Sequence, residues 1–334
     1  VEIDYLKNIY SFILIMYTFK KLTKKGNMKN IIKYTVSLFC LITFIVNANA
    51  EISFKTNVPG NKESIAYKSA QKFADEARKA SNGEINIKVF DSSALGDQVS
   101  SIQSMIAGTL DMATVETPIT TIDSALGATA LPYIFISRDH IEKALSGKAG
   151  DWIQKRLNAK GLVVLAYLEG GFRHITNNKR PIVTPADLKG VKMRTPGSKL
   201  RILTFNTYGA NASPLPFKEL YTALSTKTFD GQENPIIWVK SQKFYEVQQY
   251  LSLTGHVYTV TYLLMSKTKY DKLSSKDKEI LQKAGQLAKD YSIKLGIEAD
   301  SKVADFLKSK GMKVNQANAK SFVDASRPVW DEWV

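Results

Sequence analysis

Strand and helix patterns alternate regularly after residue 50, and this alternation limits the folds open to the chain. Residues 51–56 alternate apolar and polar side chains, which predicts a strand, and residues 62–81 place apolar side chains at helical spacing. A second strand is predicted at residues 85–89, a second helix at residues 97–108 and a third strand at residues 110–115. This β-α-β-α-β order predicts an α/β fold in which helices pack on a largely parallel sheet.

The same alternation continues towards the C-terminus without a low-complexity linker. Strands are predicted at residues 162–168, 173–176, 191–194 and 257–265, and helices at residues 138–159, 198–208, 217–224 and 275–310, the last interrupted at Gly285 and Gly296. Because no linker separates two halves, we expect the chain to cross more than once between two α/β lobes. Residues 257–265 are then expected in the sheet of the first lobe, beside the segment that begins at Glu51. Ligands of such sheets bind at the carboxyl ends of the strands.

The first 50 residues have the pattern of a targeting segment and not of a folded domain. A basic stretch follows Met28, an apolar run covers residues 35–46, and residues 48–50 form a small-x-small site. This arrangement predicts a secretory signal peptide at residues 28–50, a mature start at Glu51 and a periplasmic protein. Residues 1–27 are interpreted as an upstream extension, with a second targeting device as the alternative.

Cysteine usage agrees with export into a bacterial periplasm. The single cysteine, Cys40, lies inside the predicted signal peptide, so the mature chain has no disulfide and no thiol chemistry.

The positive charge of the chain is spread out and not clustered. The whole sequence carries +15, and residues 1–50 contribute +5 through seven Lys against Glu2 and Asp4, so the remainder carries +10. Such a surplus suits nucleic acid, an anionic membrane surface or an anionic small ligand. No run of five basic residues occurs, so we interpret the lysines as solvated helix faces that help to collect anions, and we expect no nucleic-acid partner.

Sequence signatures of catalysis are missing from the chain. It contains no nucleophile elbow, dinucleotide-binding glycine motif, phosphate loop or zinc-protease motif. His140, His174 and His256 are widely spaced, and no cluster of Cys, His or carboxylate residues predicts a metal site. We therefore expect a protein that is not an enzyme and needs neither a cofactor nor a metal.

Two arginines at strand ends point instead to carboxylate binding. Arg173 follows a double glycine, and Arg194 lies at the end of the strand predicted at residues 191–194. A guanidinium holds a carboxylate through two parallel hydrogen bonds, a geometry that Lys cannot reproduce. In a chain where Lys greatly outnumbers Arg, these positions are candidates for an anion site.

Several segments in register resemble the solute-binding proteins of TRAP transporters (tripartite ATP-independent periplasmic transporters, DctP type). The segments are residues 95–97, 108–112, 131–135, 171–178, 184–190, 193–196, 217–221 and 230–235, in this order. The resemblance extends over essentially residues 51–334. It implies a two-lobed, periplasmic-binding-protein-like α/β fold with mixed, mostly parallel sheets, crossovers between the lobes and a long helix that spans both. The chain stops where the family's last helix would begin.

The resemblance also implies lobe boundaries and partners. Lobe I would comprise residues 51–170 and about 259–300, and lobe II residues 171–258 and about 301–334. The expected partners are a small carboxylate ligand and the membrane subunits of a TRAP transporter, with the protein itself a monomer.

Six residues match positions that contact ligand in the family. Arg194 would pair with the ligand carboxylate, Arg173 would make a second carboxylate or hydroxyl contact, and Asn234, in a turn at residues 230–235, would donate a hydrogen bond from the other side. Phe217 would pack on the apolar face of the ligand. The weaker candidates are Glu116, as a hydroxyl acceptor, and Asn57, at the end of the first strand.

Departures from the sialic acid-binding members bear on the identity of the ligand. Those members have Asn where this chain has Gly197, and an acidic residue where it has Gln98. We therefore expect another sugar acid, such as a hexuronate or an aldonate, with sialic acid or a C4-dicarboxylate left open. A different class of function, a secreted enzyme that acts on an acidic sugar with Glu116 and Glu233 as acid and base, is the remaining alternative.

Overall fold

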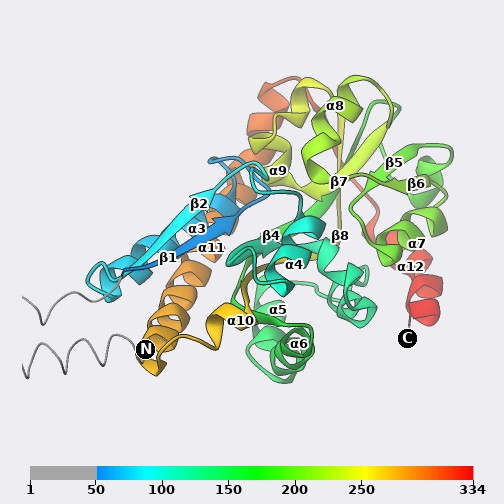
Figure 1. Ribbon diagram of the computed structural model, residues 1–334. Coiled ribbons are helices and arrows are strands. Elements are labelled where there is room, and N and C mark those ends of the chain that lie inside the picture. The colour runs from blue at the N-terminus through cyan, green and yellow to red at the C-terminus, as the bar shows by residue number, and fades with distance from the viewer. Residues whose placement is uncertain (1–50, 334) are drawn as a thin grey trace, which may run out of the picture. The chain divides into compact units, whose positions relative to one another are not determined.

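The computed structural model describes residues 51–333, and Figure 1 shows their arrangement. The predicted signal peptide at residues 28–50 and the extension at residues 1–27 lie outside the described residues. The strands are β1 (Ile52–Asn57), β2 (Ile85–Phe90), β3 (Met112–Val115), β4 (Leu162–Asn177), β5 (Lys192–Thr195), β6 (Asn211–Pro214), β7 (Gly231–Pro235), β8 (Tyr250–Ser266) and β9 (Lys313–Gln316). The larger helices are α3 (Ile65–Ala80), α4 (Gln98–Ile106), α5 (Arg138–Leu145), α6 (Lys148–Ala159), α7 (Lys199–Thr207), α8 (Leu220–Ser225), α9 (Ile236–Ser241), α11 (Ser275–Ser309) and α12 (Ala319–Trp333). Shorter helical segments are η1 (Thr117–Thr121), η2 (Ser124–Ala130), η3 (Pro185–Leu188), η4 (Phe217–Glu219), η5 (Phe244–Glu246) and α10 (Lys267–Tyr270).

All nine strands of residues 51–333 join one mixed sheet. Its order is β2-β1-β3-β8-β4-β7-β5-β6, and β9 pairs with β8. β1, β2 and β3 run parallel to one another, as do β5, β6 and β7, while β3, β4, β7 and β8 form the antiparallel pairs in the middle. The predicted mixed, mostly parallel α/β fold is therefore confirmed. β8 does lie in the same sheet as β1, but its direct neighbour is β3, so the expectation that it lies beside β1 was wrong.

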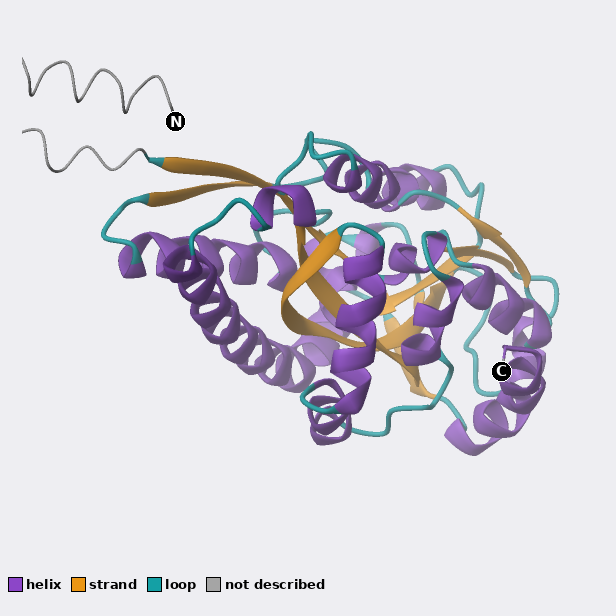
Figure 2. Cartoon of the chain, turned by 60° about the horizontal axis from the view of Figure 1, so that its bottom comes forward, coloured by secondary structure: helices purple, strands orange, loops and turns teal. Residues whose placement is uncertain are grey.

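Helices cover both faces of the half of the sheet that contains β1, β2 and β3 (Figures 1 and 2). Alternate residues of β4 point to opposite faces, as the pleat of a strand requires. Val163 and Leu165 pack with α3 and α11 in one buried cluster, whereas Leu162 and Val164 pack with α4, α5 and α6 in another. The buried, near-continuous apolar run of this strand follows from burial on both faces.

Separate buried clusters stabilise the other half of the sheet. One joins α8 and α9 to the C-terminal part of α11, and another joins β5 and α7 to Phe322 of α12. α11 is 35 residues long and contacts α3, β4 and α9, so it packs against elements from both halves of the described fold. The lobe boundaries at residues 170, 258 and 300 stay a prediction.

Two glycines that predicted breaks in α11 lie within one continuous helix. A Cβ added at Gly285 would lie 2.3 Å from the Leu165 backbone oxygen, and one added at Gly296 would lie 2.5 Å from Cγ of Glu169. Both glycines therefore face β4 and allow the helix to approach the strand closely, at the modest propensity cost of glycine in a helix. Residues 138–159 were expected as one helix but form α5 and α6, with Gly147 as the cap of α6.

Residues 230–235 were expected to form a turn, but residues 231–235 form strand β7 between β4 and β5. Every residue of β7 is buried. Similarly, the two strands predicted at residues 162–168 and 173–176 are one strand, β4, that shifts register between Glu169 and Gly171. The double glycine therefore marks a β-bulge within a strand and not its end.

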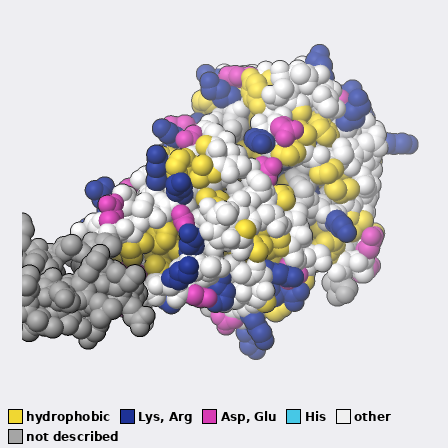
Figure 3. Space-filling model, in the orientation of Figure 1, with side chains coloured by type: hydrophobic (Ala, Val, Ile, Leu, Met, Phe, Trp, Pro, Cys, Tyr) yellow, Lys and Arg dark blue, Asp and Glu magenta, His cyan; other side chains and the backbone are white. Residues whose placement is uncertain are grey.

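The charged surface agrees with the interpretation of scattered lysines. The face in Figure 3 shows Lys and Arg side chains distributed among hydrophobic, acidic and other residues, without one dominant basic patch. Among residues 51–333, no helix combines the length and the apolar character needed to cross a bilayer.

Candidate functional site

A cavity of about 200 Å³ opens where the ends of several strands meet. Glu116 directly follows β3, Arg194 lies near the end of β5 and Asn234 near the end of β7, so the site lies at the carboxyl ends of strands, as predicted. The cavity is lined by Ser93, Asp97, Gln98, Val99, Glu116, Thr117, Pro118, Arg173, Arg194, Pro196, Gly197, Pro214, Leu215, Pro216, Phe217 and Asn234. Five of the six predicted site residues are therefore brought together, and Asn57 is the exception.

Arg194 is a buried cation with no carboxylate partner among residues 51–333. Its side chain is 2 % exposed, and Nε and Nη2 both donate to the Leu215 carbonyl oxygen, at 2.9 and 2.6 Å. These two bonds fix the guanidinium plane, while Nη1 donates to no described residue. Burial lowers the pKa of Arg194 to about 9, which still leaves it protonated at neutral pH. A fixed, desolvated cation at a cavity wall is a strong site for an anion.

Phe217 supplies an apolar surface next to this cation. The Arg194 guanidinium carbon lies 6.0 Å from the centre of the Phe217 ring, and the ring packs edge-on against Trp238 at 4.9 Å. The ring is thus held in place from behind, and its position suits a contact with the carbon chain of a ligand.

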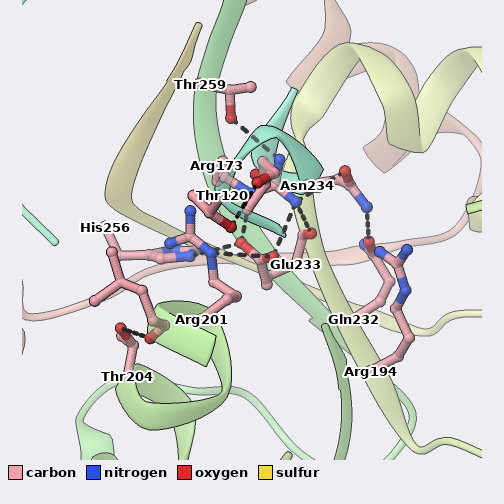
Figure 4. Close-up of polar contacts among 12 residues, drawn as sticks. Thr120, Arg173, Arg194, Arg201, Thr204, Gln232, Glu233, Asn234, His256 and Thr259 are labelled. Atoms are coloured by element: carbon pink, nitrogen blue, oxygen red, sulfur yellow. Dashed lines mark hydrogen bonds and ion pairs between the residues drawn. The ribbon is translucent and has the colours of Figure 1, made fainter. Parts of the chain in front are cut away.

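Arg173 uses most of its donors within the protein. Its Nε donates to Glu233 Oε2 at 2.5 Å, its Nη2 to Glu233 Oε1 at 2.9 Å and to Asn234 Oδ1 at 3.0 Å, and its Nη1 to the Thr259 hydroxyl at 3.1 Å (Figure 4). Arg173 therefore orients Asn234, whose Nδ2 donates to Gln232 Oε1 at 2.5 Å. A direct ligand contact of Arg173, as the family resemblance implies, would add to this network.

Glu233 is the hub of the network, and sequence reasoning considered it only for catalysis. Burial opposes its ionisation, but Arg173, Arg201 and the bond from His256 outweigh burial and lower its pKa. His256 Nε2 donates to Glu233 Oε2 at 3.0 Å, and the buried imidazole has a lowered pKa because burial disfavours its charged form. Glu233 does not line the cavity, so it braces Arg173 from behind.

Glu116 has the environment of a carboxyl that stays protonated more readily than usual. It is 6 % exposed, burial raises its pKa, and its Oε1 accepts a hydrogen bond from Thr261 at 3.1 Å. Its backbone N–H donates to Gln98 Oε1 at 2.7 Å, which ties two lining residues together. A carboxyl group at this place can accept hydrogen bonds from ligand hydroxyls.

Asn57 supports the cavity wall but does not line it. Its Nδ2 donates to the Gly96 carbonyl and the Ser101 hydroxyl, both at 2.8 Å, and its Oδ1 accepts from the Leu95 N–H. With these bonds Asn57 holds the segment that carries Asp97 and Gln98.

Sequence reasoning missed Arg201, a third buried arginine close to the site. Arg201 lies on α7 and is 1 % exposed. Arg201 lies on the buried face of this helix with Leu200, Thr204 and Phe205. The helical spacing of these residues in the sequence could have indicated that Arg201 is buried. None of the three histidines lines the cavity, and residues 51–333 contain no group of three or more His, Cys, Asp or Glu side chains placed to hold a metal ion.

Comparison with known proteins confirms the family resemblance. Residues 56–334 match the family model of bacterial extracellular solute-binding proteins, family 7 (DctP). The chain is 36% identical over 296 residues to the 2,3-diketo-L-gulonate-binding periplasmic protein YiaO of Escherichia coli. The aligned region covers 88% of this chain and 90% of that protein.

Solved structures of TRAP periplasmic solute-binding proteins share the fold. A protein from Polaromonas sp. JS666 bound to D-erythronate is 36% identical with a TM-score of 0.83, over 85% of this chain and 94% of that one. The sugar acid-binding protein DctPAm from Advenella mimigardefordensis, in complex with galactonate, is 33% identical with a TM-score of 0.82, over 84% and 92% of the two chains.

Proposed function

Because the chain belongs to the DctP family of bacterial extracellular solute-binding proteins, which serve TRAP transporters, we propose that it captures a small sugar acid and delivers it to a TRAP-type membrane permease. The observation that carries the proposal is Arg194, a buried guanidinium fixed by Leu215 that lacks a carboxylate partner among the described residues. In this proposal the protein is exported, works in the periplasm as a monomer and does not turn its ligand over.

The ligand carboxylate would bind Arg194 through the unused Nη1, with Asn234 on the other side and Phe217 against the carbon chain. Glu116 would accept hydrogen bonds from ligand hydroxyls. A carboxylate removed from water needs a cation and further donors to replace its hydration, and these residues supply them. Arg173 would act through its hold on Asn234 as well as by any direct contact.

The size of the cavity and the known ligands of relatives favour a short sugar acid. Cavities for drug-sized ligands usually measure roughly 300–1,000 Å³, and about 200 Å³ is smaller. The three relatives described above bind 2,3-diketo-L-gulonate, D-erythronate and galactonate, all of them sugar acids. Gly197 lines the cavity without offering a side-chain hydrogen bond, which argues against the larger, more polar sialic acid. We therefore propose an aldonate or hexuronate, with a C4-dicarboxylate as the alternative.

The geometry favours binding without catalysis. An enzyme with Glu116 and Glu233 as acid and base would need both carboxyl groups in the cavity. Glu233 is instead held by Arg173 and His256 outside the lining, and its lowered pKa makes its carboxylate a weak base.

A thermal-shift screen tests the proposal directly. The protein is heated with a panel of aldonates, hexuronates, C4-dicarboxylates and sialic acid, and each hit is titrated calorimetrically and then analysed for product by mass spectrometry. We expect one-to-one binding of a sugar acid that is recovered unchanged. Stabilisation by no carboxylate, or conversion of the bound acid, would contradict the proposal.

A further inference from the structure

The side chain of Arg201 is buried without a hydrogen bond to any described residue. Nε and Nη1 are fully shielded from solvent and donate to nothing. The closest acidic group is Glu233, whose Oε1 lies 3.7 Å from Arg201 Nε, an ion-pair distance too long for a hydrogen bond. Burial lowers the pKa of Arg201 to about 10, so the guanidinium is charged at neutral pH. A buried guanidinium whose N–H groups lack hydrogen-bond acceptors is costly unless an anion or strong acceptors accompany it.

Both oxygens of Glu233 accept hydrogen bonds from other residues, and neither accepts one from Arg201. Oε1 accepts from Arg173 Nη2, and Oε2 accepts from Arg173 Nε and from His256 Nε2. One carboxylate therefore faces the two guanidiniums of Arg173 and Arg201, which leaves one positive charge in excess. Figure 4 shows Arg194 and Arg201 on opposite sides of Glu233, so a ligand carboxylate at Arg194 would not compensate Arg201.

A second, small cavity lies against Arg201. Its volume is about 20 Å³, enough for one water molecule or one small ion. The lining residues are Glu116, Thr117, Ile119, Thr120, Leu126, Thr129, Ala130, Arg201, Tyr258, Thr259, Val260 and Tyr262. Glu116 and Thr117 also line the larger cavity, so the two spaces adjoin.

The polar groups of this small cavity are rich in unused donors. The Thr259 hydroxyl accepts from Arg173 and therefore keeps its own hydrogen for another partner, and the Thr117 hydroxyl has no partner among the described residues. The carboxyl of Glu116 has a raised pKa, so it is less of an obstacle to an anion than an ordinary carboxylate. Together with Arg201, these groups suit an occupant that only accepts hydrogen bonds.

We propose that the small cavity binds one monovalent inorganic anion, chloride under ordinary conditions, held by the Arg201 guanidinium and the hydroxyls of Thr117 and Thr259. The anion balances the charge that Glu233 leaves uncompensated. This site is separate from the carboxylate site at Arg194 and does not depend on the identity of the organic ligand.

Bromide crystallography tests the site in the unaltered protein. Crystals of the mature chain are grown in sodium bromide, and anomalous diffraction is recorded near the bromine absorption edge. We expect an anomalous peak within hydrogen-bonding distance of Arg201 Nε or Nη1. Density without an anomalous signal would identify a water molecule and overturn the proposal, as would an unoccupied cavity.

Thermal unfolding tests whether the anion also binds in solution and not at crystal concentration only. Tm is measured in sodium chloride and in sodium methanesulfonate, whose anion is too large for the cavity, at the same ionic strength. Chloride at about ten times its dissociation constant should raise Tm by roughly 3 °C. An equal Tm in both salts would overturn the proposal.

Three variants assign the solution effect to the correct arginine. Arg201→Gln should abolish the chloride-dependent rise in Tm, and the exposed Arg78→Gln should retain it. Arg194→Gln should also retain it, although it should lose the organic ligand. A chloride effect that disappears in Arg194→Gln but persists in Arg201→Gln would place the anion in the ligand cavity and refute the inference, while leaving the proposed function intact.

Discussion

Replacing Arg194 should separate ligand binding from stability, because burial of this cation opposes folding when no ligand is present. A fall in pKa from the usual 12.5 to about 9 corresponds to roughly 5 kcal/mol of unfavourable free energy. This cost is fully present below pH 9 and fades as the pH rises from 9 towards 12.5, since the lowered pKa belongs to the folded state.

Two hydrogen bonds offset much of that cost in the unliganded protein. Arg194 donates twice to the Leu215 carbonyl, and hydrogen bonds of charged donors contribute about 1.5–3 kcal/mol each. Arg194→Met removes both the cost and the two bonds. We therefore expect the free energy of unfolding without ligand to change by less than about 2 kcal/mol, as measured by urea denaturation.

Ligand binding should respond much more strongly. Arg194→Ala leaves the ligand carboxylate desolvated and unpaired, which costs about 3–5 kcal/mol, or two to four orders of magnitude in Kd. Arg194→Lys keeps the charge but loses the planar donor geometry, so it should recover only part of the affinity. The exposed Arg180→Ala is the matched control and should bind normally.

Calorimetric titration with the acid found in the screen gives the decisive result. Near-normal affinity of Arg194→Ala would refute the assignment of the anchor. Arg173, the other cation that lines the cavity, would then be the next candidate for the anchor, although it already donates to Glu233, Asn234 and Thr259.

Three further predictions concern stability and processing. Glu233→Gln should lower the free energy of unfolding by about 3–5 kcal/mol in urea denaturation, because two guanidiniums lose their carboxylate. Because the pKa of Glu233 is lowered, its contribution to the free energy of unfolding is present above the unfolded-state pKa and is lost on acidification. A stability difference between the wild type and Glu233→Gln that is unchanged at pH 2 would contradict this reasoning. Gly296→Ala should cost about 1–3 kcal/mol through its clash with Glu169 and lower Tm, whereas the exposed Lys283→Ala should not. Mass spectrometry of the exported protein should find Glu51 at the N-terminus, and a chain that retains Met28 would disprove cleavage after residue 50.

Periodicity predicted the elements whose side chains alternate between the core and solvent. Phe54 of β1 and Ile85 and Ile87 of β2 are buried as their spacing requires.

Glycine was a poorer guide, because the same residue ends a helix, bends a strand or permits close contact. Gly171 has φ +99° at the bulge of β4, and a Cβ at Gly170 would lie 2.5 Å from the Thr259 carbonyl oxygen. The constraint at Gly170 comes from the neighbouring strand β8 and cannot be inferred from the residues around the glycine.

Strand β7 could not be predicted because partners on another strand satisfy its polar residues. Gln232 donates to Thr176 and Glu233 accepts from Arg173, so a fully polar sequence is buried in the middle of a sheet. A local sequence pattern predicts that polar residues are exposed. It cannot include Thr176 and Arg173, because these partners lie more than 50 residues away in the sequence.

The candidate carboxylate site at Arg194 could be predicted only in part from the sequence. The two Arg residues predicted at strand ends stood out from a Lys-rich background, and both line the cavity, although Arg173 lies within β4. The sequence could not show that Leu215 fixes Arg194 while Glu233 occupies Arg173. In the proposed function, that difference makes Arg194 the anchor and Arg173 its support.

The position of β8 between β3 and β4 determines when the chain can finish folding. β3 ends at residue 115 and β4 at residue 177, but both pair with a strand that extends to residue 266. During synthesis, these two strands therefore expose unpaired edges until most of the polypeptide has been made. Pairing across such sequence separations makes folding slow. A chain delayed in this way stays open to chaperones during synthesis, and it reaches its compact state only after nearly all of it has been made.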